Sequence, residues 1–177
     1  MQYTLGGARP TNELIEALNR RIQSMADAHT MLSQSHWRGV SLADLLRRQL
    51  APYTTETNMV VSGTDITLSA SQAQALAMVL QELVTNAVKY GSLSTPHGRV
   101  SVNWHRRDRA DGAARVAIEW RETGGPPAKA PSQTSYGTNL IRNLIPHELG
   151  GTVDLVFAPE GLRCDIEMPL GWARVAN

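Results

Sequence analysis

The helical pattern between Ser69 and Gly91 constrains the fold of this chain more than any other feature. It opens with the capping-box sequence Ser69-Ala-Ser-Gln72, and Gly91 follows the last turn, where we expect a left-handed cap. One face of the predicted helix is apolar and carries Leu76, Leu80, Leu83 and Ala87. Because such a face must be buried, the helix is predicted to pack in the core of a layered domain.

Another helical pattern runs from Thr11 to Gln34 and has heptad spacing. The residues Ile15, Leu18, Ile22, Met25 and Leu32 recur at alternating steps of three and four, with His29 in the one missing place. A lone helix of this length is marginal in water, so this apolar seam is expected to pack against its own domain, a second helix or a second copy of the chain. We interpret His29 as a packed core or interface residue.

The other regular patterns are a short helix and several strands. A capping box at Ser41 predicts a helix that Pro52 ends. Residues 59–68, interrupted at Ser62-Gly63, are predicted to form a short hairpin. Alternating apolar residues predict two antiparallel strand pairs, 100–104 with 116–120 and 152–157 with 162–168. Because hairpins separate the helices, we predict an α+β fold with one sheet covered on one face.

Composition narrows the class of protein. The chain has 177 residues, 42% of them hydrophobic, enough for one domain and a small appendage. Its net charge of +1 gives no electrostatic footprint for nucleic acid or an anionic membrane. The single cysteine, Cys164, excludes an internal disulfide and is expected to be a small core residue. With no apolar run near 18 residues and no leader pattern, we expect no direct membrane insertion and a cytoplasmic location.

The helix after Ser69 also carries a narrow polar strip. At 100° per residue, Glu82, Asn86 and Lys89 lie within roughly 60° of one another, away from the apolar face. Carboxylate and amide oxygens suit Mg²⁺, and an ammonium offsets phosphate charge, so the strip is typical of a site for a phosphate with Mg²⁺. From the spacing alone, a solvated helix face with one Glu–Lys contact is the alternative.

The strip is part of one of five motifs that follow in a fixed order, "ELVTNAVKYGSLS", "WRETGGP", "YGTNLI", "ELGG" and "GLRCDIEMPL". Together they resemble the ATP-binding domain of sensor histidine kinases, a two-layer α/β sandwich called the Bergerat fold, and within that family the HWE group. The stretch 21–42 is similar to the segment that joins the second dimerisation helix to the catalytic domain in that group. The resemblance implies four regions: a start at 1–10 that is disordered or artificial, a remnant of the second dimerisation helix at 11–36, an ATP-binding catalytic domain at 37–172 and a tail at 173–177.

The resemblance also implies roles for the matched residues. Glu82, Asn86 and Lys89 would be catalytic: the first polarises the attacking imidazole or a magnesium-bound water, the second binds Mg²⁺, and the third lies beside the phosphates. Glu122 would accept a hydrogen bond from the adenine amino group. The other matched contacts to ATP are Tyr90, Gly124, Gly125, Tyr136, Gly137, Thr138 and Asn139.

This chain departs from the family pattern at several points. Gln81 stands where the group has histidine, and Ser135 stands where glycine is common. We find no phosphoacceptor motif His-Arg-x-x-Asn, so the acceptor is expected on a removed N-terminal portion or on another chain. The implied partners are a histidine-bearing dimerisation helix and a response regulator, with a homodimer in the full-length protein. Two alternatives stay open: a non-enzymatic phosphotransfer adaptor with a decayed ATP site, and a serine kinase of the anti-sigma type.

Overall fold

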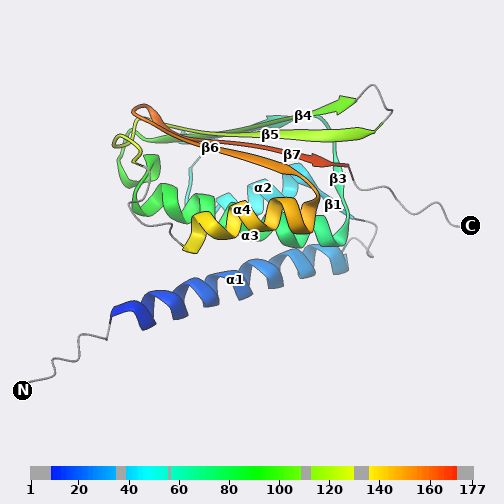
Figure 1. Ribbon diagram of the computed structural model, residues 1–177, viewed down its shortest axis with the longest axis horizontal. Helices are drawn as coiled ribbons and strands as arrows, with labels where there is room; N and C mark the ends of the chain where they lie inside the picture. The colour runs from blue at the N-terminus through cyan, green and yellow to red at the C-terminus, as the bar shows by residue number, and fades with distance from the viewer. Residues whose placement is uncertain (1–8, 35–38, 56, 109–112, 130–135, 171–177) are drawn as a thin grey trace, which may run out of the picture.

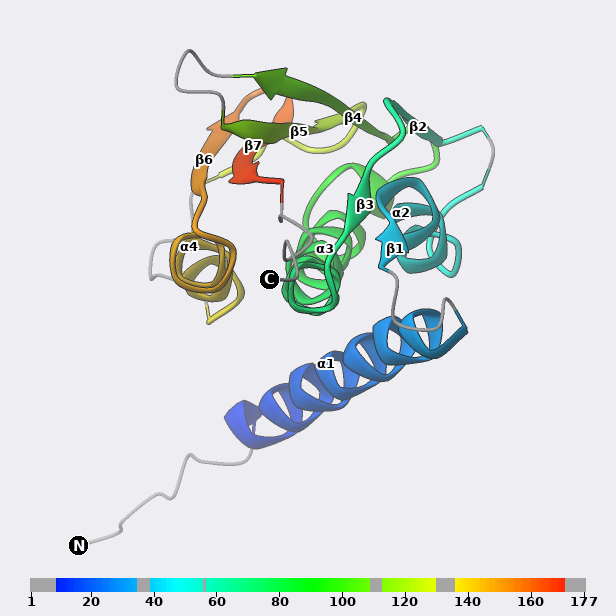
Figure 2. The same cartoon turned by 90° about the vertical axis from the view of Figure 1, so that its right-hand side faces the viewer.

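The computed structural model describes residues 9–34, 39–55, 57–108, 113–129 and 136–170. Its elements are α1 (Arg9–Gln34), β1 (Val40–Ser41), α2 (Leu42–Leu50), β2 (Met59–Gly63), β3 (Thr67–Leu68), α3 (Ala70–Lys89), the 3₁₀ turn η1 (Ser92–Ser94), β4 (Arg99–Asp108), β5 (Ala114–Thr123), α4 (Tyr136–Leu149), β6 (Thr152–Ala158) and β7 (Gly161–Pro169). Five strands form one sheet in the order β2-β4-β5-β7-β6. Figures 1 and 2 show α2, α3 and α4 on one face of this sheet, which confirms the predicted α+β sandwich.

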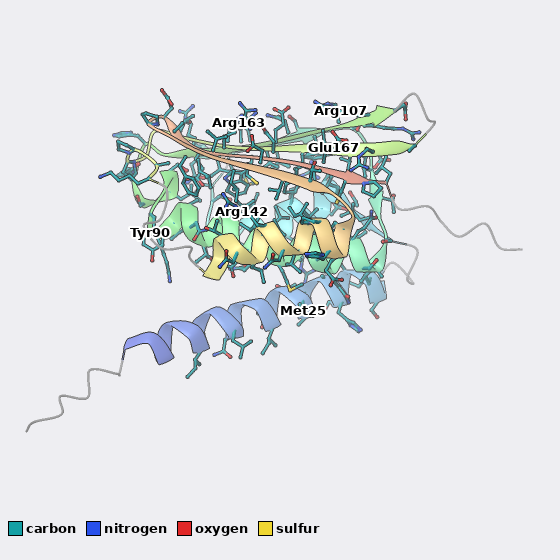
Figure 3. The ribbon with its side chains drawn as sticks, in the orientation of Figure 1. Met25, Tyr90, Arg107, Arg142, Arg163 and Glu167 are labelled. Carbon is teal, nitrogen blue, oxygen red and sulfur yellow. The ribbon has the colours of Figure 1, made fainter. Side chains whose placement is uncertain are left out.

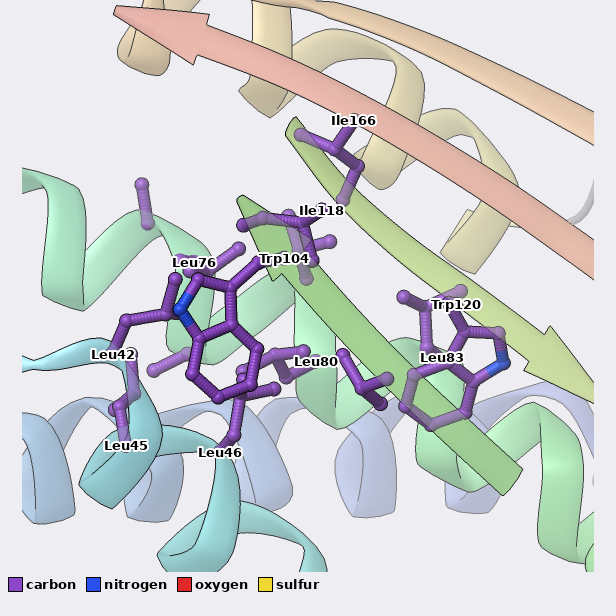
Figure 4. Close-up of a cluster of buried hydrophobic side chains, with 14 of the residues drawn as sticks. Leu42, Leu45, Leu46, Leu76, Leu80, Leu83, Trp104, Ile118, Trp120 and Ile166 are labelled. Atoms are coloured by element: carbon purple, nitrogen blue, oxygen red, sulfur yellow. The ribbon is translucent and has the colours of Figure 1, made fainter. Parts of the chain in front are cut away.

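The core lies between the sheet and α3. The predicted capping box is present at Ser69, whose hydroxyl accepts from the backbone N–H of Gln72 while the Gln72 side chain accepts from the Ser69 N–H. Trp104 of β4 and Trp120 of β5 are buried as their strand alternation predicts. In Figure 4 their rings lie among the leucines of α2 and α3, and Ile118 and Ile166 extend the same cluster across the sheet.

The outer face of the sheet is polar. Glu167 of β7 forms ion pairs with Arg115, at 2.7 Å, and with Arg107, at 3.4 Å. Asp165, two residues before it on the same face, pairs with Arg121 at 2.6 Å, and Figure 3 shows Arg163 on this surface. Since these ion pairs are partly exposed, each contributes little to stability, and they leave this face of the sheet solvated.

The hairpin predicted over residues 59–68 is wrong. β2 runs parallel to β4, and α3 makes the crossover between them, whereas β3 pairs with β1 in a separate two-stranded sheet. Gly63 is the last residue of β2, and a Cβ atom there would approach the Trp104 ring to 2.3 Å. The glycine is therefore required by the packing of an indole and does not form a turn.

Helix α1 lies on the side of the helical layer away from the sheet (Figures 1 and 2) and contacts α3. Only the end of the seam packs on this domain: Leu32 is fully buried, while Ile15, Leu18, Ile22 and Met25 are between 41% and 57% exposed. His29 is exposed, so its interpretation as a core residue is wrong, and its interface role stays a prediction. Within the described part of the chain, no helix combines the length and hydropathy needed to cross a membrane.

Candidate functional site

The polar strip of α3 meets the beginning of α4. A Cβ atom added to Gly137 would lie 2.5 Å from the Glu82 carboxylate oxygen Oε2 and 3.9 Å from the Asn86 Nδ2 atom. Three predicted site residues that are far apart in the sequence are therefore brought together. Because the first backbone N–H groups of a helix have no intrahelical acceptor, α4 directs donors toward this junction.

The other residues of the first turn of α4 differ in exposure. Thr138 is buried and Asn139 is exposed. The side chain of Tyr136 and all of Ser135 lie outside the described residues. The phosphate contacts expected of Gly137, Thr138 and Asn139 therefore stay a prediction.

The donor atoms at this junction fit Mg²⁺. Glu82 and Asn86 are both half-buried and lie one helical turn apart. Among the described residues, no three His, Cys, Asp or Glu side chains gather as a metal cluster. An ion held here would take one or two oxygens from the protein and the rest from phosphate and water, as Mg²⁺ commonly does.

Lys89 and Tyr90 lie at the end of α3, and both side chains are exposed. Figure 3 shows Tyr90 at the end of the molecule where α3 ends, and it is 72% exposed. In this structure neither residue is buried against the strip, so their contacts with a nucleotide stay a prediction.

Glu122, the predicted adenine acceptor, is buried at the end of β5. Its Oε2 accepts from the Ser92 backbone N–H at 2.8 Å, and its Oε1 accepts from the Trp120 indole N–H at 3.1 Å. Burial raises the pKa of the Glu122 carboxyl, and these hydrogen bonds oppose that rise because they favour the ionised form. Since a carboxylate has about four acceptor positions, each oxygen keeps capacity for another donor.

Glycines pack tightly around this carboxylate. Gly91 has an extended backbone with φ −111°, so the predicted left-handed cap is wrong. A Cβ atom there would lie 2.1 Å from Glu122 Oε2, and one on Gly125 would lie 2.5 Å from the Ser92 Cα atom. Gly124 has φ +73°, and its carbonyl accepts from the Thr95 hydroxyl at 2.8 Å. These glycines let the segment after α3 approach the end of β5.

The sequence analysis did not predict the hydrogen-bond partners of Glu122 and Gln81. Trp120 and Glu122 share the inward face of β5, and their spacing of two could have indicated the contact. Nothing in the sequence signals that Ser92 would donate to Glu122. Gln81 is also buried, where its side-chain amide donates to the Tyr53 hydroxyl at 3.1 Å.

Known proteins similar to this chain are histidine kinases. Residues 1–65 match the model of the family described as HWE histidine kinase. A blue-light-activated histidine kinase of Rhizobium johnstonii is 35% identical over 153 residues, which is 86% of this chain and 43% of that protein. One of Brucella anthropi is 32% identical over 169 residues, which is 94% of this chain and 34% of that protein. The chain thus spans less than half the length of these relatives.

Solved structures show the same fold. The histidine kinase domain of the Erythrobacter litoralis EL346 blue-light activated histidine kinase matches with a TM-score of 0.62 at 17% identity, covering 87% of this chain and 75% of that one. The mycobacterial sensor histidine kinase MprB matches with a TM-score of 0.54 at 19% identity, covering 75% of this chain and 96% of that one.

Proposed function

We propose that this chain binds ATP and transfers the γ-phosphoryl group to a histidine imidazole, because its sequence is similar to HWE histidine kinases and it has the fold of a histidine kinase catalytic domain. The observation that carries the proposal is the approach of Gly137, at the beginning of α4, to Glu82 and Asn86 of α3. A helix N-terminus beside a carboxylate and an amide provides donors for phosphate oxygens and oxygen ligands for the ion that accompanies them.

Each residue has a separate part in the transfer. Asn86, with Glu82 through a water molecule, would hold Mg²⁺, which neutralises phosphate charge when bound. Glu82 also polarises the attacking imidazole, and the α4 amides with Lys89 bind the phosphates. Because phosphoryl transfer requires little covalent chemistry from the protein, positioning and charge neutralisation supply most of the catalysis.

The other end of the site would hold the purine. Glu122 accepts from the adenine amino group, and guanine presents a carbonyl oxygen at that position, so a carboxylate favours adenine. Tyr90, Gly124 and Gly125 line the base. Because the protein would use ATP, its proposed location is the cytoplasm. These assignments rest on the motif match and on the buried carboxylate at the end of β5.

The partners of the whole protein are part of the proposal. The exposed seam of α1, Ile15, Leu18, Ile22 and Met25, supports packing against a second helix, as expected for a dimerisation region. A histidine on a dimerisation helix would accept the phosphoryl group, and a response regulator would receive it next.

Replacing Asn86 tests the proposed function. Asn86→Ala should abolish phosphorylation of a supplied histidine-bearing dimerisation domain and reduce Mg²⁺-dependent binding of a non-hydrolysable ATP analogue to the level seen with EDTA. Gln74→Ala makes the control, because Gln74 is also half-buried on α3 but lies about two turns before Glu82, where the strip begins. Thermal unfolding of both variants should resemble that of the unmodified protein. Retained phosphorylation in Asn86→Ala would refute the assignment.

The same assay separates the two alternatives. An adaptor with a decayed site would bind no ATP analogue, although the carboxylates and the amide at positions 82, 122 and 86 are present. A serine kinase would give a product that survives acid, whereas phosphohistidine is lost in acid.

A further inference from the structure

The Glu122 carboxylate is held by two donors from different segments. Trp120, two residues earlier on β5, donates its indole N–H to Oε1, and the Ser92 backbone donates to Oε2. Glu122 is 4% exposed, and the space beside Oε2 is closed by Gly91, where a Cβ atom would lie 2.1 Å away. With a donor on each oxygen and close packing at its side, the carboxylate has little freedom to rotate.

This arrangement fixes which acceptor positions are left. Each oxygen uses one position on a protein donor, so a ligand must approach along the directions that remain. Hydrogen bonds to an ionised group are worth more than those between neutral groups, and a buried polar group without its partner is costly. Loss of one donor would therefore let the carboxylate turn toward the vacated side.

We propose that Trp120 is a positioning residue for the purine, because its indole N–H orients the Glu122 carboxylate to accept from the adenine amino group. The inference rests on the proposed function and deepens it. Trp120 does not touch the nucleotide in this arrangement; it acts through Glu122 and determines how strongly adenine is preferred over guanine.

Trp104 provides a matched control. It is also a buried tryptophan on an inward strand position, and its indole N–H donates to the Thr64 carbonyl oxygen at 2.7 Å. Figure 4 shows the two indoles in separate parts of the core. Trp104→Phe and Trp120→Phe therefore remove the same ring volume and one buried donor each, and they differ in the acceptor that is left without its partner.

The experiment measures the dissociation constants of non-hydrolysable ATP and GTP analogues with Mg²⁺, together with urea unfolding of each variant. Trp120→Phe should weaken ATP-analogue binding about tenfold and GTP-analogue binding much less, so that the preference for adenine shrinks. Trp104→Phe should leave both constants within about twofold, because its bond lies away from Glu122. If Trp120→Phe does not fold, the residue 3-benzothienylalanine at position 120 keeps the ring size without the N–H and should give the same result.

Two results would overturn the inference. An unchanged ratio of ATP to GTP affinity in the Trp120 variants, with normal binding by the unmodified protein, would mean that the indole only stabilises the core. Failure of the unmodified protein to bind the ATP analogue would overturn the proposed function and this inference with it.

Discussion

Gly91→Ala should destabilise the protein through a steric clash rather than through backbone strain. The φ of Gly91, −111°, is accessible to any residue, but an alanine Cβ would lie 2.1 Å from Glu122 Oε2 and 2.9 Å from the Ala87 Cα atom. The carboxylate can move away only by breaking its bond from Ser92. Overpacking costs about 1–3 kcal/mol, and a buried donor left unsatisfied costs about as much. Since the lower entropy of the unfolded alanine chain offsets roughly 0.4–1 kcal/mol of this, we expect a loss of about 3 kcal/mol.

Gly150 gives the opposite case and serves as the control. Its φ is +60°, and the nearest atom to an added Cβ is 3.7 Å away, so Gly150→Ala should cost about 1 kcal/mol from the left-handed backbone alone. Asparagine tolerates the left-handed conformation, so Gly150→Asn should be more stable than Gly150→Ala. At position 91, where the backbone is not left-handed, Gly91→Asn should be no more stable than Gly91→Ala.

Urea unfolding of the four variants at neutral pH measures these differences. The reasoning would be refuted if Gly91→Asn were clearly more stable than Gly91→Ala, because that pattern belongs to a left-handed cap. A loss below about 0.5 kcal/mol in Gly91→Ala would also refute it, since the carboxylate would then move without cost.

Two further predictions concern titration. Burial raises the pKa of the Cys164 thiol from 9.0 to about 12. At pH 8 a thiol reagent should therefore react about a thousandfold more slowly with the folded protein than with protein unfolded in urea. Equal reaction rates would contradict the burial of Cys164. Because the pKa of Glu122 is raised above 4.5 in the folded state, its contribution to stability is full below about pH 4.5 and is lost as pH rises through the folded-state pKa. The unfolding free energy of the unmodified protein, relative to that of Glu122→Gln, should therefore fall as pH rises from about 4.5 to the folded-state pKa of Glu122. A rise over these pH values would show that the hydrogen bonds to Glu122 outweigh its burial.

The sequence predicted those parts of the fold whose signals are local. The capping box at Ser69, the alternation around Trp104 and Trp120, and the burial of Cys164 follow from short patterns and are confirmed. Gly63 and Gly91 were both interpreted through backbone freedom, the usual local reason for a glycine. In the structure both are close to side chains from distant strands, so their reason lies in tertiary packing that no local pattern contains.

The two ends of the candidate site are built by different physical means. Around Glu122 the groups are buried, and glycines at 91, 98, 125 and 161 would each bring a Cβ within 2.5 Å of a neighbouring atom. At the junction of α3 and α4, Glu82, Asn86 and Gly137 are half-buried. A buried, closely packed acceptor is oriented before any ligand arrives, whereas half-exposed oxygens take their final positions with the ion and phosphates. Substitutions at the β5 end should therefore reduce stability and base preference together, while substitutions in the strip should reduce activity with little change in stability.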